Sequence, residues 1–147
     1  MSRTTNSPSP SAAGRVAAAL LLVVAAFQAA LAAGAPLGEA AFGGARPGVL
    51  PDTLRVSSAI AAVAYLLLAA VAGTRWAGPA VRRRVLTGAA GVMVVGSIVN
   101  LASPSFVERM IWTPVTVALV VALWHAARHG SLSRASRSSV AFGSGQA

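Results

Sequence analysis

The amino-acid sequence predicts an all-α protein, a membrane-embedded antiparallel four-helix bundle, on three observations. Hydrophobic residues make up 56% of the chain and charged residues only 10%, whereas a soluble domain carries about 25% charged residues. The hydrophobic residues gather in four long segments, at residues 16–33, 54–72, 85–102 and 106–127. A membrane-spanning helix needs roughly 20 apolar residues. Four such helices with short connections account for the 147 residues and leave no room for a soluble domain.

The first span follows a polar segment. Residues 1–15 are rich in Ser, Thr and Pro, which predicts a disordered cytoplasmic tail. The span at 16–33 is interrupted only by Gln28, and a glycine and a proline follow it as helix breakers. An alternative stays open, because Arg3 and Arg15 before an apolar run that ends in small residues also fit a cleaved signal peptide. Cleavage would leave three spans and would move the N-terminus to the outside.

The connection between the first two spans, residues 35–53, contains four glycines and three prolines. This density predicts an absence of regular structure. Asp52 follows Pro51 and is a suitable N-cap for the second span at 54–72. The next connection, residues 73–84, is a short turn with four arginines.

The third span, residues 85–102, contains Gly88 and Gly91, which with nearby Gly96 and Ser97 offer small surfaces for close helix contact. A tight turn leads to the fourth span at 106–127. Pro114 lies inside this fourth span, where it removes a backbone hydrogen bond and is expected to kink the helix. Such a kink could open a small cavity. The Ser- and Gly-rich residues 128–147 are expected to form a second disordered cytoplasmic tail.

Arginine distribution predicts the orientation in the cell membrane. The two tails and the turn at 73–84 contain nine arginines, and the other connections with the adjoining helix ends contain three. Both termini are therefore expected in the cytoplasm. The nine are Arg3, Arg15, Arg75, Arg82, Arg83, Arg84, Arg128, Arg134 and Arg137, and the three are Arg46, Arg55 and Arg109.

The charge and the missing cysteines limit the partners. The net charge of +9 comes from arginines that flank apolar spans, so the expected partners are the lipid bilayer and its anionic headgroups at the cytoplasmic face, and not nucleic acid. A homo-oligomer or a membrane protein partner is also possible. The absence of cysteine excludes thiolate zinc sites and iron–sulfur clusters. His125 and His129 share a helix face, but without a nearby third ligand we expect no metal and no cofactor.

The predicted outer side carries the candidate site. All three acids of the chain lie there, together with polar residues at the helix ends. A polar cluster at one face of a small helical bundle is the default location for a site. The candidate binding residues are Glu39, Arg55, Asn100, Ser103, Glu108, Arg109 and Trp112. No residue is assigned a catalytic role.

Structural explanations compete with this hypothesis. Ser105 and Glu108 have the spacing of a capping box, which is the more economical role for Glu108. Arg55 and Arg109 each lie near the start of a helix, where a cation opposes the helix dipole. Each therefore requires a compensating partner, either an acid such as Asp52 or an anionic ligand. Trp112 is expected to anchor the helix at the membrane interface, as are Trp76 and Trp124 at the other side.

Several short motifs support a resemblance. They are Gly34-Ala35-Pro36-Leu37-Gly38, Gly43-Gly44, Leu50-Pro51 with Arg55, Asn100-Leu101-Ala102-Ser103-Pro104-Ser105, Glu108-Arg109 and Trp112-Thr113-Pro114. Over residues 16–127 the chain resembles small four-helix integral membrane proteins of the actinobacterial type, an uncharacterised family. The resemblance implies the fold and no activity.

Three functions remain open at this point. The first is a non-enzymatic membrane partner or regulatory protein with a polar site at the outer face. The second is a membrane enzyme or binding protein for a lipid or amphiphile, in which Arg55 and Arg109 hold an anionic group and Glu108 acts as acid or base. The third is a small transporter, which ranks last because such exporters need an acid within a span, and the first span offers only Gln28.

Overall fold

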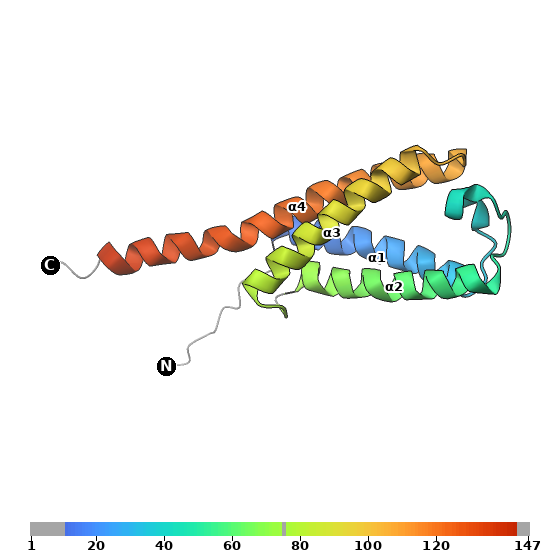
Figure 1. The fold of residues 1–147 in the computed structure, drawn as a ribbon. Coiled ribbons are helices and arrows are strands. Elements are labelled where there is room, and N and C mark those ends of the chain that lie inside the picture. The colour runs from blue at the N-terminus through green and yellow to red at the C-terminus, as the bar shows by residue number, and fades with distance from the viewer. Residues whose placement is uncertain (1–10, 75, 144–147) are drawn as a thin grey trace.

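The computed structural model describes the backbone of residues 11–74 and 76–143 and the side chains through residue 128. Within these residues the protein is all-helical (Figure 1), with four long helices, α1 (Ala12–Ala32), α2 (Asp52–Gly73), α3 (Pro79–Leu101) and α4 (Phe106–Gly143). Two short 3₁₀ turns, η1 (Gly38–Ala40) and η2 (Phe42–Gly44), lie between α1 and α2. Each long helix contains a segment long and apolar enough to cross a membrane, so the predicted helical membrane bundle is confirmed.

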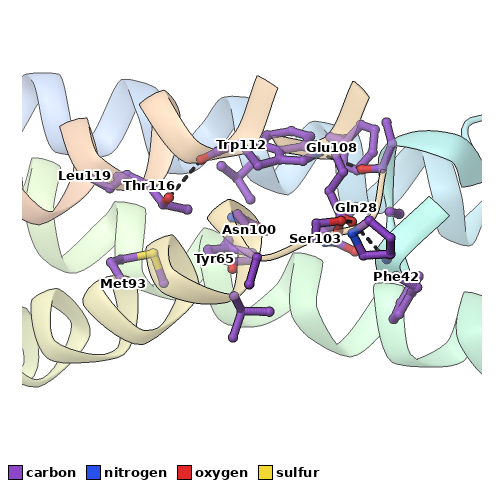
Figure 2. A pocket seen from close by; sticks show the side chains of 18 residues that line it. Gln28, Phe42, Tyr65, Met93, Asn100, Ser103, Glu108, Trp112, Thr116 and Leu119 are labelled. Carbon is purple, nitrogen blue, oxygen red and sulfur yellow. Dashed lines mark hydrogen bonds between the residues drawn. The ribbon is translucent and has the colours of Figure 1, made fainter. Parts of the chain in front are cut away.

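The helices form two antiparallel hairpins. Figure 1 shows α1 beside α2 and α3 beside α4, and the two pairs diverge toward the end that carries η1 and η2. We call this end the loop end; it comprises residues 33–51 and the turn at 102–105. The opposite end, residues 11–15, 76–84 and 126–128, is the arginine end. Between the diverging hairpins lies a pocket (Figure 2).

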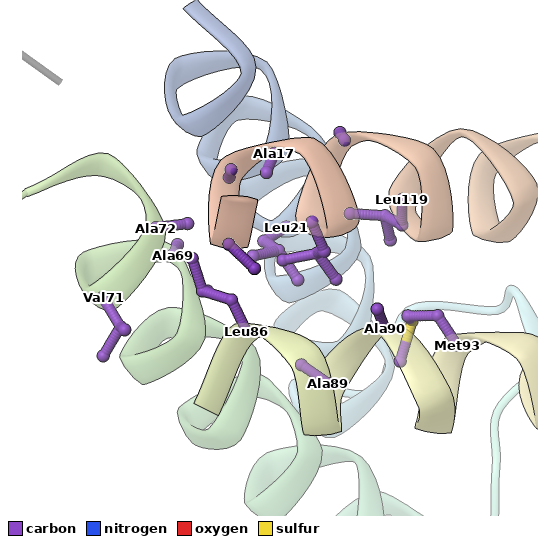
Figure 3. Packing of buried hydrophobic residues seen from close by; sticks show 14 of the residues in the cluster. Ala17, Leu21, Ala69, Val71, Ala72, Leu86, Ala89, Ala90, Met93 and Leu119 are labelled. Atoms are coloured by element: carbon purple, nitrogen blue, oxygen red, sulfur yellow. The ribbon is translucent and has the colours of Figure 1, made fainter. Parts of the chain in front are cut away.

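The core fills the space between the hairpins toward the arginine end. Figure 3 shows Leu21 of α1 and Leu86 of α3 meeting among small residues such as Ala17 and Ala72. Small residues also bring α1 and α2 close together, because a Cβ added at Gly73 would lie 2.9 Å from the Cβ of Ala18. Most other large apolar side chains are exposed on the bundle surface, as expected where lipid is the solvent.

The helix ends differ from the expected boundaries. Residues 12–15 are helical because the Ser11 side chain caps α1, accepting a hydrogen bond from the Gly14 N–H at 3.1 Å. The third helix begins at Pro79, a favoured first residue, and therefore includes the arginines at 82–84. The expectation of disorder requires correction for residues 128–143, because α4 continues through Gly143. Residues 1–10 and 144–147 lie outside the described part of the chain.

Two local expectations were wrong. Asp52 is the first residue of α2 and the N-cap is Pro51, so the Asp52 side chain caps nothing. Gly88 and Gly91 make no close helix contact, because a Cβ at either position would meet nothing within 4 Å. The face of α3 that enters the core instead presents Leu86 and Met93, with alanines between them.

Candidate functional site

The pocket at the loop end has a volume of about 610 Å³, within the range of small-molecule sites. Figure 2 shows Met93, Thr116 and Leu119 at one end of it and Phe42 at the other. Its walls are largely apolar. They come from all four helices and both connections: Val24, Phe27 and Gln28 (α1), Ala40 to Gly43 (loop), Tyr65 (α2), Met93, Val99 and Asn100 (α3), Ala102 to Pro104 (turn), and Glu108, Trp112, Thr116 and Leu119 (α4).

Side chains near the start of α4 hold the loop in place over the pocket. The Glu108 carboxylate accepts from the Gly43 N–H at 2.9 Å, and the Trp112 indole N–H donates to the Ala40 carbonyl at 2.7 Å. The Ser105 hydroxyl donates to the Glu39 carbonyl at 2.6 Å. Backbone N–H and C=O groups near lipid need hydrogen-bond partners within the protein, because lipid chains offer none. The glycine-rich connection is therefore a folded cover with two 3₁₀ turns, and the expectation of no regular structure there was wrong.

The cover contains a strained turn at the pocket mouth. Phe42 lies in the left-handed region with φ +52°, followed by Gly43 at φ +77° and Gly44 at φ +70°. Such a conformation costs a non-glycine residue about 1–3 kcal/mol. Gly44 also permits close approach, because a Cβ there would lie 2.6 Å from the Cβ of Ser105.

Glu108 is the only acid that lines the pocket among the described residues. Its Oε2 accepts from Gly43 and from the Ser103 hydroxyl at 2.5 Å. Its Oε1 accepts no hydrogen bond from any described residue. The Glu108 N–H donates to the Ser105 hydroxyl at 3.1 Å, so the first half of the predicted capping box is confirmed. In the second half of a capping box the Glu side chain accepts from the backbone N–H of the Ser. This expectation is wrong, because the Ser105 N–H donates to the Ser103 hydroxyl instead.

Two amides in the pocket lack partners among the described residues. The side-chain oxygen of Gln28 is buried and accepts no hydrogen bond. The Asn100 side chain also lines the pocket and makes no hydrogen bond to the described part of the chain. A buried acceptor without a donor is costly in a low-dielectric interior. The pocket therefore presents acceptors that a bound molecule with N–H or O–H groups could satisfy.

Trp112 makes contacts that its expected role as an interfacial anchor did not include. Besides its bond to the loop, its ring packs on Phe27 with 4.5 Å between the ring centroids. Thr116 lies one turn further along α4 and donates its hydroxyl hydrogen bond to the Trp112 carbonyl at 2.8 Å, as the dashed line in Figure 2 marks. Pro114 lies between them in the sequence but is exposed and does not line the pocket, so a cavity opened by a proline kink stays a prediction.

Arg55 is placed away from the pocket. Its Nε donates to the Ala32 carbonyl at 3.0 Å, and one Nη lies 3.3 Å from the Asp52 carboxylate. The guanidinium therefore caps the carboxyl end of α1, where a cation is favourable. Gly34 turns the chain after α1 with φ +93°, a backbone conformation that favours glycine. The ion pair with Asp52 was among the expected compensations, whereas the contact with α1 was not.

Arg109 and Glu39 also lie outside the pocket lining. The Arg109 guanidinium lies 3.4 Å from the Ser103 carbonyl and 6.0 Å from the Phe106 ring centroid. Glu39 is exposed, and only its backbone carbonyl takes part in the loop contacts. The structure thus brings Asn100, Ser103, Glu108 and Trp112 together and directs the other three candidate side chains elsewhere.

Among the polar lining residues, the sequence interpretation missed Tyr65 and Thr116, and it noted Gln28 within the first span without naming it as a candidate binding residue. Each is a polar group within an apolar span, and that position is itself a signal of function in membrane proteins. The predicted pair of His125 and His129 cannot be followed here, because the His129 side chain lies outside the described residues. Comparisons with protein-family models, with curated proteins and with solved structures found no match.

Proposed function

We propose that this membrane protein is a non-enzymatic binding protein for a small amphiphile, whose head carries hydrogen-bond donors or a positive charge. The observation that carries the proposal is the pocket of about 610 Å³ with apolar walls and with the buried, unpaired side-chain oxygen of Gln28. The apolar part of the ligand lies against residues such as Met93 and Leu119. The head faces Gln28, Asn100 and the Oε1 of Glu108.

The charge of the pocket favours a cation over an anion. Glu108 lines it and no arginine does among the described residues. The attraction between a carboxylate and a cation is stronger in a low-dielectric site than in water. An anionic head would instead meet Glu108 without a compensating cation, since Arg55 and Arg109 are turned to backbone carbonyls. The version of the alternative function that uses these two arginines to hold an anion is therefore not supported.

Binding without catalysis fits the lining better than an enzyme does. Tyr65 and Glu108 are the only titratable side chains among the residues that line the pocket. One oxygen of Glu108 already holds the loop and Ser103. General acid–base catalysis needs a titratable group free to reach the reacting atoms, and the Glu108 carboxylate is already engaged in holding the cover. The amphiphile enters from the lipid between α2 and α3, the two consecutive helices that contact each other least.

Glu108→Gln is expected to weaken binding of a cationic amphiphile by roughly tenfold or more, since hydrogen bonds to charged groups contribute about 1.5–3 kcal/mol. Glutamine still offers an oxygen to the Gly43 N–H, so the loop is retained. The measurement is energy transfer from Trp112 to a dansyl alkylamine in nanodiscs. Trp76 and Trp124 are replaced by phenylalanine, which leaves one of the three tryptophans as donor.

The matched control is Glu39→Gln, which removes the same charge from the same end of the bundle outside the pocket. It is expected to leave the affinity unchanged. A dansyl fatty acid of equal chain length is expected to bind more weakly than the amine. Equal binding of acid and amine, or equal losses in both variants, would contradict the proposal.

We further propose that the arginine end faces the cytoplasm, on the arginine bias of nine against three. Because the chain has no cysteine, single cysteines report their side of the membrane without background. We expect Arg46→Cys in the loop to react with an impermeant maleimide in intact spheroplasts. Gly78→Cys at the arginine end is expected to react only after lysis. The reverse pattern would place the pocket in the cytoplasmic leaflet.

A further inference from the structure

A second hollow lies at the arginine end, so it is at the opposite end of the bundle from the pocket. It has a volume of about 470 Å³ and lies between α3 and α4. Arg83, Arg84 and Thr87 of α3 and Trp124, Ala127 and Arg128 of α4 line it. We propose that it binds a phosphate group, carried there by an anionic phospholipid.

The spacing of the residues explains why they converge. Arg83 and Arg84 lie four and three residues before Thr87, and residues with this spacing share a helix face. Trp124 and Arg128 are likewise four apart on α4. The two faces meet because α3 and α4 pack along each other as one hairpin. Arg82, one position earlier, is directed to the carbonyls of α2 and α4 instead and does not line the hollow.

The local charge favours an anion strongly. Three guanidinium groups line one hollow, whereas the three acids of the chain lie in or next to the loop end, in the cover or in the first turns of α2 and α4. The negative end of the α4 helix dipole is distant, because that helix continues to Gly143. A phosphate between the guanidiniums would relieve their mutual repulsion and accept several charge-assisted hydrogen bonds.

Two features favour a lipid over a soluble phosphate. The Arg128 guanidinium lies 4.4 Å from the centroid of the Trp124 ring, which positions it by a cation–π contact. Trp124 is itself half-exposed near the end of the apolar segment Phe106–Arg128, the depth at which aromatic residues meet lipid headgroups. A phospholipid can therefore place its phosphate on the arginines while its chains continue along the exposed apolar surface of α3.

The test uses the full chain in phosphatidylcholine nanodiscs that contain a minority of phosphatidylglycerol. Quenching of Trp124 by brominated lipid reports which lipid occupies the hollow, in a background with Trp76 and Trp112 replaced by phenylalanine. We expect a preference of roughly tenfold for brominated phosphatidylglycerol over brominated phosphatidylcholine, as several charge-assisted hydrogen bonds would give. The double variant Arg83→Gln/Arg84→Gln is expected to lose that preference.

The matched control is Arg15→Gln/Arg46→Gln, which removes two arginines outside the hollow. It is expected to keep the preference. An equal loss in both double variants would assign the preference to net charge and overturn the site. Arg128→Gln tests the same hollow from the other helix, should the first variant fail to fold, and is also expected to reduce the preference.

Soluble competitors distinguish the two sources of phosphate. Millimolar inorganic phosphate is expected to leave the quenching by phosphatidylglycerol unchanged. If it abolishes the preference, the hollow takes free phosphate and the assignment to a lipid is overturned. If the protein shows no preference between the two brominated lipids, the lipid site is likewise overturned.

Discussion

Arg82→Ala is expected to lower the free energy of unfolding by about 2–4 kcal/mol. The Arg82 guanidinium donates to the carbonyls of Val71 at 3.2 Å, Ala72 at 3.0 Å and Ala126 at 2.8 Å. One side chain thus caps the carboxyl end of α2 and joins the two hairpins. Its loss leaves carbonyl groups without donors in a region with little water. Unfolding in mixed micelles of a mild detergent and dodecyl sulfate measures the difference.

The neighbouring arginines supply the control for this prediction. Arg83→Ala and Arg84→Ala remove the same charge from exposed positions on the same turn of α3 and are expected to leave the midpoint of unfolding nearly unchanged. The unfolding midpoint of Arg82→Lys is expected to lie between that of the Arg83→Ala and Arg84→Ala variants and that of Arg82→Ala. The reason is that an ammonium group cannot reproduce the fork of guanidinium donors. If all three alanine variants unfold alike, Arg82 does not join the hairpins.

The second large effect is expected from Gly38→Ala in the loop. A Cβ at this position would lie 1.9 Å from the Arg46 carbonyl oxygen and 2.9 Å from that of Gly48. Because both neighbours are backbone atoms, the cover must open to admit a methyl group. We expect the amides of residues 34–51 to exchange roughly tenfold faster or more, while the four helices stay protected. Hydrogen exchange read by mass spectrometry resolves the two regions.

Two other glycines calibrate this result. Gly48 has φ +84° but open space around its Cβ position, so Gly48→Ala carries only a backbone penalty of about 1–2 kcal/mol. Gly78 has neither constraint, and Gly78→Ala is expected to be silent. An order of effects other than Gly38, Gly48, Gly78 would mean that the loop is not packed as described.

The spans were predictable from sequence because lipid imposes one rule on every residue in them. Long apolar runs with glycine and proline between them leave few alternatives. The helix ends were less predictable, because an apolar run marks the part of a helix that lies in lipid and does not mark where the helix begins or ends. At the arginine end, the helices continue past the apolar run to exposed residues such as Arg15 and Arg83, whose long stems keep the charge in a polar region.

The site was predictable in position and only partly in detail. The concentration of acids and polar residues at one end indicated where to look, and Glu108 and Asn100 do line the pocket. The position of a residue in the sequence does not predict the direction in which its long side chain points. Arg55 turns to the end of α1 and Arg82 turns inward, while Arg83 and Arg84 turn outward, although the three adjacent arginines are chemically identical.

The divergence of the hairpins has a mechanical consequence. The hairpins are joined by the core and by Arg82 toward one end, whereas at the other they are bridged mainly by the cover's hydrogen bonds to α4. The two hairpins are therefore held together firmly at the arginine end and more weakly at the loop end. Lateral pressure from the surrounding acyl chains acts on the diverging ends of the two hairpins. We therefore expect membrane thickness and composition to change the width of the pocket while each hairpin keeps its own structure.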